Sequence, residues 1–322
     1  MEKKLRDEIF QDCLYNWERS DGHSEFWITL AQKWGYPTSE SLRQEFKHLR
    51  RKMGIKKDTV VENPKGNNNP KILILDIETS IRHAFLFRSG EQWVAGDQFE
   101  DEPMMLGYSA KYAGDSKVMS DFLTPEEAIS KDHSRVVKSL WNLLSTVNIT
   151  VSYNGNSFDV KNINMFFLKE KLGLPNKIKN IDPCIMARST FAFDSNKMTD
   201  VVKYLGLDDG KHKMERDDWI KCYYGDKQSL LKMEKYCKHD VEILELILDQ
   251  IKPYVSNLPN MGIYGDVKES QCPSCGGIKF VPNGFAYTSV GKYNCYRCEC
   301  KTLFRSKDNL LSKDKRKNLM SF

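Results

Sequence analysis

Four carboxylates stand out in this sequence because of their surroundings and their order along the chain. They are Asp76 and Glu78 at the end of an aliphatic run, Asp159 after a turn-forming Asn-Gly pair, and Asp240 within a long amphipathic segment. Carboxylate oxygens are the hard donors that Mg²⁺ and Mn²⁺ prefer. Two such ions, about 3.5–4 Å apart, can stabilise both the attacking and the leaving oxygen of a phosphodiester. The candidate chemistry is therefore metal-assisted hydrolysis.

The first pair of acids follows a predicted buried strand. Residues 71–77 are nearly all aliphatic, which predicts a strand, and both of its faces are apolar, as in the middle of an α/β sheet. Asp76 and Glu78 are two residues apart and project from the same face. Two like charges at the end of a buried strand are unfavourable unless a cation neutralises them. Taken alone, the pair is also compatible with acids that face solvent at a strand end.

Asp159 is predicted to lie where a second strand turns into a helix. Residues 147–153 predict a short strand, Asn154 and Gly155 favour a turn, and residues 159–172 have apolar side chains at helical spacing. This places Asp159 near a helix N-terminus. A simple helix-capping role is the alternative, because Asp is common at that position.

The fourth acid belongs to the clearest helix in the sequence. Residues 227–251 have apolar side chains at steps of three and four, which predicts one buried stripe. Tyr236 and Asp240 are one turn apart on a flanking face. Without the other motifs, they would be interpreted as a half-exposed tyrosine beside a solvated acid.

The ordered set of motifs resembles the proofreading exonuclease domain of family B DNA polymerases. The motifs are D-x-E at Asp76 and Glu78, F-D at Asp159, and Y-x-x-x-D ending at Asp240. More broadly, the chain is similar to the DEDD superfamily of 3′→5′ exonucleases over about residues 71–255. The branch with histidine in the last motif would have it at position 235, which is lysine here, so the resemblance is to the tyrosine branch.

This resemblance implies a fold and a role for each site residue. The implied fold is an α/β ribonuclease-H-like mixed sheet flanked by helices. Asp76 would bridge two Mg²⁺ or Mn²⁺ ions, Glu78 and Asp240 would complete the site that activates water, and Asp159 would hold the second metal. Tyr236 would orient the attacking water, since an unperturbed phenol, with a pKa near 10, is a poor base. Asn154 and Phe158, from the second motif, are expected to contact nucleic acid.

The C-terminal part of the chain predicts a zinc ribbon. Five of the nine cysteines lie in residues 272–300, and two C-x-x-C pairs are separated by a stretch typical of a β-hairpin. We predict one structural Zn²⁺ bound by Cys272, Cys275, Cys295 and Cys298. Cys300 offers a spare ligand. The hairpins and the basic tail at 313–317 either contact nucleic acid or are solvated, and a solvated tail is favoured.

The N-terminal part predicts two helices separated by a short break. The helices span residues 25–34 and 39–53, and the second has basic side chains along one face: Arg43, Lys47, Arg50, Arg51 and Lys52. This arrangement resembles a helix-turn-helix DNA-binding module. The alternative is a helical cap or dimerisation element with a solvated basic face. Residues 58–70 predict a flexible linker.

Length and composition favour several soluble domains. The chain has 322 residues, 40% of them hydrophobic, and a net charge of +5. We expect a helix-turn-helix-like module at 1–57, the nuclease at 71–255, and the ribbon with its tail at 256–322. Between 80 and 123, two strands antiparallel to the first are expected near 104–111 and 117–122, and a helix follows near 125–147.

These predictions favour a 3′→5′ exonuclease that prefers DNA to RNA. The alternatives are an RNA exonuclease, a structure-selective endonuclease, and a DNA-binding regulator with an inactive nuclease core. The start of the chain has no apolar signal region and no segment long enough to cross a membrane, so a cytoplasmic location is expected. The layout resembles phage or bacterial proteins, in which case the location is the host cytoplasm. Protein partners cannot be predicted.

Overall fold

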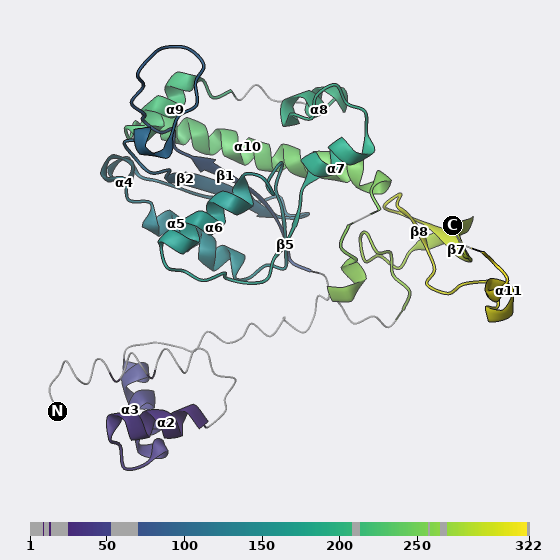
Figure 1. Cartoon of the computed structure of the whole chain (residues 1–322), viewed down its shortest axis with the longest axis horizontal. Helices are drawn as coiled ribbons and strands as arrows, with labels where there is room; N and C mark the ends of the chain where they lie inside the picture. Colours follow the sequence, from purple (N-terminus) through teal and green to yellow (C-terminus); the bar gives the residue numbers. More distant parts are fainter. Residues whose placement is uncertain are drawn as a thin grey trace. The chain divides into compact units, whose positions relative to one another are not determined.

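The computed structural model describes most of the chain (Figure 1). The described residues are 9, 13, 25–52, 70–207, 213–256, 258–264 and 269–320. The chain divides into two compact units, Met1–Gly66 and Asn67–Phe322. Of the predicted linker, residues 58–69 lie outside the described part.

A five-stranded mixed sheet forms the centre of the larger unit, with strand order β3-β2-β1-β4-β5. The strands are β1 (Ile72–Thr79), β2 (Met105–Tyr112), β3 (Met119–Phe122), β4 (Ile149–Val151) and β5 (Lys179–Ile181). β1 pairs antiparallel with β2 and parallel with β4, and β2 pairs antiparallel with β3. The predicted α/β mixed sheet is confirmed, as is the strand near 104–111 antiparallel to the first. The second expected strand forms as β3, but it is antiparallel to β2 and so runs parallel to β1, and its predicted direction is wrong.

Helices cover both faces of the sheet, which explains why β1 is apolar on both sides. Leu73 and Leu75 pack in a core with side chains of α5 (Ser134–Leu144) and α6 (Asp159–Lys169). Ile74 points the other way, into a second core with the C-terminal half of α10 (Lys227–Ile251). Each fully buried aliphatic side chain contributes about 1.5–3 kcal/mol to folding. The central strand is therefore held firmly from both sides.

The long helix α10 has the bounds that the sequence predicts, and Asp226 caps it by accepting the Ser229 N–H at 2.8 Å. The helix α8 (Met198–Tyr204) also belongs to this unit. The remaining elements of this unit were not predicted: β5, α7 (Pro183–Thr190), α9 (Arg216–Tyr223) and the short 3₁₀ turns Gly96–Gln98, Lys252–Tyr254 and Met261–Tyr264. They are short, so their apolar pattern is too brief to identify from the sequence.

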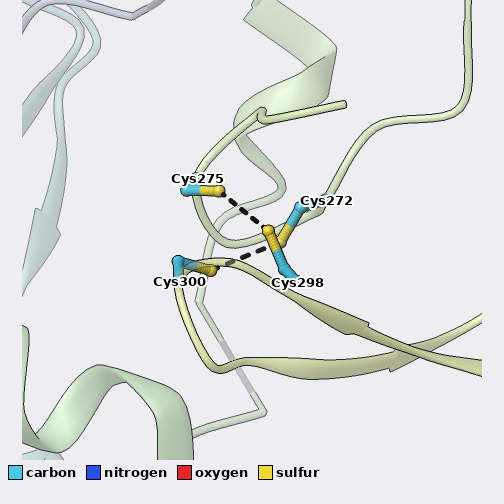
Figure 2. A group of neighbouring side chains, drawn as sticks. All are labelled: Cys272, Cys275, Cys298 and Cys300. Atoms are coloured by element: carbon cyan, nitrogen blue, oxygen red, sulfur yellow. Dashed lines mark hydrogen bonds between the residues drawn. The ribbon is translucent and has the colours of Figure 1, made fainter. Parts of the chain in front are cut away.

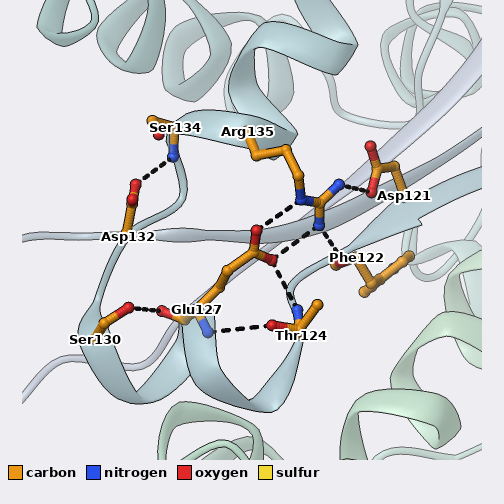
Figure 3. A network of polar contacts seen from close by, with 8 residues as sticks. All are labelled: Asp121, Phe122, Thr124, Glu127, Ser130, Asp132, Ser134 and Arg135. Carbon is orange, nitrogen blue, oxygen red and sulfur yellow. Dashed lines mark hydrogen bonds and ion pairs between the residues drawn. The ribbon is translucent and has the colours of Figure 1, made fainter.

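The single helix expected at 125–147 is wrong, because the chain forms two helices there. α4 (Pro125–Ser130) ends at Lys131, which has a left-handed backbone with φ of 60°, and α5 starts at Ser134. Thr124 and Glu127 cap the start of α4 reciprocally, at 3.2 and 2.9 Å. Arg135 then binds Glu127 at 2.6 Å and the Phe122 carbonyl at 2.8 Å (Figure 3). These contacts fix the break between the helices.

Two smaller parts complete the structure. The C-terminal module contains a three-stranded sheet of β6 (Phe280–Thr288), β7 (Gly291–Cys298) and β8 (Leu303–Arg305), followed by α11 (Lys313–Lys317). The N-terminal unit contains α2 (Glu25–Trp34) and α3 (Ser39–Lys52), whose buried side chains include Trp27, Leu30, Leu42 and Phe46. Within the described residues, no helix is long and apolar enough to cross a membrane.

We predict that Gly107→Ala destabilises the sheet near the acidic pair. Gly107 lies opposite Glu78, and a Cβ there would lie 2.3 Å from the Phe122 ring. Overpacking of this kind should lower the free energy of unfolding by about 1–3 kcal/mol, measured by denaturant titration of the full chain. Gly173→Ala is the matched control, because a Cβ there meets open space. Equal stability of the two variants would contradict the described packing of Phe122.

Candidate active site

Three elements bring the four acids together at the carboxyl end of β1. Asp76 and Glu78 lie on β1, and their carboxylate oxygens lie within 4.8 Å of each other and of the Cys237 sulfur. Asp159 is the first residue of α6, and its Oδ1 accepts the Ile77 N–H at 3.2 Å. Asp240 lies on α10, which packs against β1 and β2. The residues that the sequence selected are therefore brought together.

Burial raises the pKa values of all four acids, and the charges of neighbouring acids add to this effect at Asp76 and Glu78. Burial first, and then the charges of neighbouring acids, hold the pKa values of Asp76 and Glu78 well above their ordinary range. Burial also raises the pKa of Asp159 to about 7 and that of Asp240 to about 6. Glu78 and Asp159 are only 6% and 3% exposed. A cluster of acids that resists ionisation in this way favours a bound cation, which would remove the repulsion.

Tyr236 is hydrogen-bonded to Asp240 on the same face of α10. Burial and the nearby Asp240 charge raise the pKa of Tyr236 far above that of a free phenol. The tyrosine therefore keeps its proton at neutral pH and cannot act as a general base. It can still position a molecule beside Asp240 through its hydroxyl group.

Cys237 is a site residue that the sequence did not reveal. The sequence places it only in the buried stripe of the helix, whereas its thiol donates to Asp76 Oδ2 at 3.2 Å and approaches the Asp76 carbonyl oxygen at 3.5 Å. The side chain is fully buried. Its position directly after Tyr236 was the only signal available. The hydrogen bond from the thiol fixes the orientation of the Asp76 carboxylate.

Asp182 is a second such residue, and it fixes the loop that leads to Asp159. This buried carboxylate accepts the backbone N–H groups of Asn154 at 2.9 Å and Asn156 at 3.0 Å. It also caps α7. Asn154 has a left-handed backbone with φ of 57° and is exposed, as is Phe158, which keeps 42% of its surface. Both residues expected to contact nucleic acid thus lie on an ordered, exposed loop beside the acids.

The donor set of this cluster fits divalent metal ions of the hard type. Four carboxylates from three elements offer several oxygen atoms, which suits Mg²⁺ or Mn²⁺ better than soft ions. The thiol of Cys237 is occupied by its contact with Asp76, and burial and the neighbouring acids raise its pKa well above the usual range. It therefore remains a neutral donor to the carboxylate.

Four cysteines converge in the C-terminal module (Figure 2). The sulfurs of Cys272 and Cys300 are 3.7 Å apart, those of Cys275 and Cys298 are 3.6 Å apart, and all four lie within 4.8 Å of one another. Tetrahedral zinc with Zn–S bonds of about 2.3 Å would separate neighbouring sulfurs by about 3.8 Å. The geometry is compatible with a closed four-thiolate zinc site.

The expected ligand Cys295 lies outside this cluster, and Cys300 takes its place. Cys295 and Cys298 are three residues apart in β7, so their side chains project from opposite faces of the strand. The turn after β7 brings Cys300 round to Cys272, because the Lys301 N–H bonds the Cys298 carbonyl at 2.9 Å and Lys301 has a φ of 68°. The C-x-x-C spacing therefore led to the wrong prediction that Cys295, and not Cys300, is the fourth ligand.

The predicted basic face of the N-terminal unit is partly described. Arg43 and Lys47 of α3 are exposed, opposite the buried Leu42 and Phe46. The side chains of Arg50 and Arg51 lie outside the described residues. The exposure of Arg43 and Lys47 is compatible with contacts to phosphate but is equally expected of a solvated face.

We predict that the metal-free protein loses stability as the pH rises. The folded pKa values of about 7 for Asp159 and about 6 for Asp240 lie above those of an unfolded chain. The stability present below pH 4 is therefore lost as the pH rises through these folded values. In Mg²⁺-free buffer, Asp240→Asn should raise the free energy of unfolding at pH 8 by about 1–2 kcal/mol and flatten the pH profile.

Thermal unfolding at pH 5 and pH 8 checks this prediction. Mg²⁺ should stabilise the wild type at pH 8 and stabilise Asp240→Asn less. Asp217→Asn is the control, since Asp217 is an exposed acid on α9. A wild-type profile no steeper than that of Asp240→Asn would contradict the raised pKa of Asp240.

We also predict that Cys300→Ser loses the zinc and Cys295→Ser retains it. Only Cys300 belongs to the group of four sulfurs. Elemental analysis after dialysis should find about one Zn²⁺ per chain in the wild type and in Cys295→Ser, because four thiolates close the site. Retention of zinc by Cys300→Ser, with loss from Cys295→Ser, would restore the original assignment.

Comparisons with known proteins gave a family match and a structural match. Residues 97–252 match a family model described as RNase_H superfamily, a range that includes Asp159 and Asp240 and begins after the first acidic pair. A solved structure of the family B DNA polymerase from the archaeon Pyrobaculum calidifontis aligns with 13% identity and a TM-score of 0.43. That alignment covers 61% of this chain and 27% of the polymerase chain.

A search of curated protein sequences gave no match. Within the larger unit, residues 97–252 nevertheless match the model of a known superfamily. Its α/β core is ribonuclease-H-like, and with its ordered acidic motifs the chain resembles a DEDD exonuclease of the proofreading type.

Proposed function

We propose that this protein is a two-metal-ion 3′→5′ exonuclease that acts on single-stranded or frayed DNA. The observation that carries the proposal is the convergence of the acids from β1, α6 and α10 in one buried cluster with raised pKa values. Such a cluster destabilises the fold unless a bound cation neutralises it. Nucleic-acid hydrolysis is the chemistry that suits both this donor set and the ribonuclease-H-like core.

Each acid has a distinct proposed role. Asp76 lies at the centre of the cluster and would contact both metal ions, Glu78 and Asp240 would share the ion on the water side, and Asp159 would hold the other. When bound, the two ions supply a nucleophilic water and stabilise the charge that develops on the leaving oxygen. The Cys237 thiol keeps the Asp76 carboxylate in one orientation, which reduces the cost of organising the site.

Tyr236 would orient the attacking water rather than deprotonate it. Its hydroxyl group is bound to Asp240, and its raised pKa keeps it protonated at the pH of reaction. In-line attack on the last phosphodiester would leave the phosphate on the released nucleotide. The expected product is therefore a nucleoside 5′-monophosphate, released from the 3′ end.

The loop before α6 would receive the 3′ end of the strand. Asp182 fixes this loop, and Phe158 presents an exposed ring beside Asp159 on which a base can stack. DNA is proposed over RNA because the motifs resemble polymerase proofreading domains. Arg43, Lys47, Arg50 and Arg51 of α3 would add phosphate contacts at a distance from the reaction.

Two other nuclease functions use the same acids. An RNA exonuclease would have the same cluster and a different preference for the sugar. A structure-selective endonuclease would cut internally because it does not grip a free end. One cleavage assay distinguishes both functions from the proposed one, with labelled RNA and circular single-stranded DNA as additional substrates.

The test is digestion of 5′-labelled single-stranded DNA with Mg²⁺ or Mn²⁺. The wild type should give a ladder that shortens from the 3′ end, and a blocked 3′ terminus should resist. Asp76→Ala should lower turnover by about a hundredfold or more, since loss of a central ligand removes the charge stabilisation on which the reaction depends. Tyr236→Phe should have a milder effect, because the water can still be held by the metal site.

Matched substrates and variants complete the design. Asp217→Ala, which removes an exposed acid on α9, should keep wild-type turnover. Efficient cutting of circular single-stranded DNA would favour the endonuclease, and faster digestion of labelled RNA would favour the RNA exonuclease. Activity of Asp76→Ala equal to that of the wild type would disprove the site assignment.

A further inference from the structure

The positive charge of this protein is concentrated in its C-terminal module. Residues 269–320 contain ten Lys and Arg and four Asp and Glu, a net charge of +6. The whole chain has a net charge of +5, so the remaining residues together sum to −1. The mild positive charge of the chain is therefore a property of the cysteine-containing module, and a polyanion would be attracted to this part first.

The two faces of the three-stranded sheet in this module differ. One face carries Ala286, Cys295 and Leu303, which line a cavity of about 440 Å³ together with Val255 and Pro273 from the preceding segment. This face therefore lies beside the segment that precedes the sheet. The register of β6 with β7 then assigns the opposite side chains to the other face.

That second face, here called the ribbon face, includes five aromatic side chains and one lysine: Phe280, Phe285, Tyr287, Lys292, Tyr296 and Phe304. Pro282, Asn294 and Cys298 project from the same face. Three of the rings pack into a small core, since the ring centroids of Phe280 lie 5.2 Å from those of both Tyr296 and Phe304. These three rings give the face a rigid base.

The rings of Phe285 and Tyr287 are packed less closely and remain exposed to solvent. Phe285 keeps 50% of its surface exposed and Tyr287 keeps 69%. They are two residues apart on β6, so their Cα atoms are separated by about 6.8 Å and both rings project from the same face. Exposed aromatic rings at regular spacing on a rigid strand are unfavourable in water and suit the stacking of flat groups.

The ammonium group of Lys292 lies over one face of the Phe285 ring, which leaves the other face for a base. Lys292 is the cross-strand partner of Tyr287, and its Nζ lies 3.8 Å from the centroid of Phe285 and 5.9 Å from that of Tyr287. An ammonium group in this position can contact a phosphate while neighbouring bases stack on the rings. Paired bases in a duplex have their faces covered by their neighbours, so the combination selects unpaired strands.

We propose that the ribbon face is a binding site for single-stranded nucleic acid, in which bases stack on Phe285 and Tyr287 and Lys292 contacts the backbone. The site is separate from the acidic cluster and from the predicted basic face of α3. The proposal concerns binding alone and stands whether or not the acidic cluster cleaves DNA.

Binding of a fluorescein-labelled, short single-stranded oligodeoxynucleotide to the full zinc-loaded chain tests this proposal. The Asp76→Ala protein is the host for all variants, so that the probe is not degraded, and fluorescence anisotropy gives the Kd. Phe285→Ala/Tyr287→Ala should weaken binding by about tenfold per ring. Lys292→Gln should reduce the slope of log affinity against log salt by about 0.7, the value for one phosphate contact on a single strand.

Two further double substitutions distinguish the loss of base stacking from a general loss of apolar surface. Phe285→Leu/Tyr287→Leu should bind nearly as weakly as the alanine pair, whereas Phe285→Tyr/Tyr287→Phe should bind like the host. Ile278→Ala/Val281→Ala is the matched control, because both side chains are more than half exposed on the same module and neither belongs to the ribbon face. Zinc content and circular dichroism show whether each variant is folded.

Each outcome of the binding assay either supports or overturns the proposed site. A Kd for the alanine pair within about twofold of the host would overturn the proposal, as would an equal loss in the control pair. Leucine variants that bind as tightly as the aromatic ones would disprove stacking. An RNA probe of the same sequence identifies the sugar preference, and a loss of affinity with either probe supports the site. Cleavage by the wild-type chain is measured separately, so failure of the proposed nuclease activity would not be confused with failure of this site.

Discussion

The repulsion between Asp76 and Glu78 at the end of β1 is the constraint around which the larger unit is built. Burial and the charges of neighbouring acids both oppose ionisation of these two side chains, so a nearby cation would stabilise their anionic forms. The fold must therefore hold Asp76 and Glu78 together against a force that separates them. It does so by placing them on a strand that helices cover from both sides, where Leu73, Ile74 and Leu75 are fully or almost fully buried.

The rest of the site is arranged to tolerate this repulsion. The Cys237 thiol and the Ile77 N–H are neutral donors that satisfy carboxylate oxygens without neutralising them. Asp182 is a further acid nearby, and its four backbone N–H contacts stabilise its charge within the loop. A lysine in any of these positions would neutralise the cluster permanently. The observed neutral donors leave the charge available for a metal ion.

The sequence was sufficient for the core of the site but not for its details. The four acids could be selected because each lies in or close after a segment with a clear apolar pattern: Asp76, Glu78, Asp159 and Asp240. A long segment such as residues 227–251 can be recognised as a helix from that pattern alone. Asp182 and Cys237 could not, since their roles arise from backbone N–H groups and from contacts between distant elements. Cys300 was missed because side-chain direction in a strand, not spacing along the chain, decides which cysteine faces the cluster. The break between α4 and α5 at Lys131 depends on the Thr124 cap and on the contacts of Arg135. The pattern of apolar residues does not indicate either of them.

The pairing of β1 has a consequence for how such proteins can diversify. β4 accompanies β1 only as far as Ile74, and from there to Thr79 the strand is paired on one side alone. A pocket of about 210 Å³ lies beside this stretch, lined by Leu75 of β1, Thr150 of β4 and Asp159. The segment after β4 ends at Asp159 and is held by Asp182, whereas the segment between β1 and β2 carries none of the four acids. The segment after β1 can therefore lengthen, shorten or change sequence during evolution while the catalytic acids are preserved.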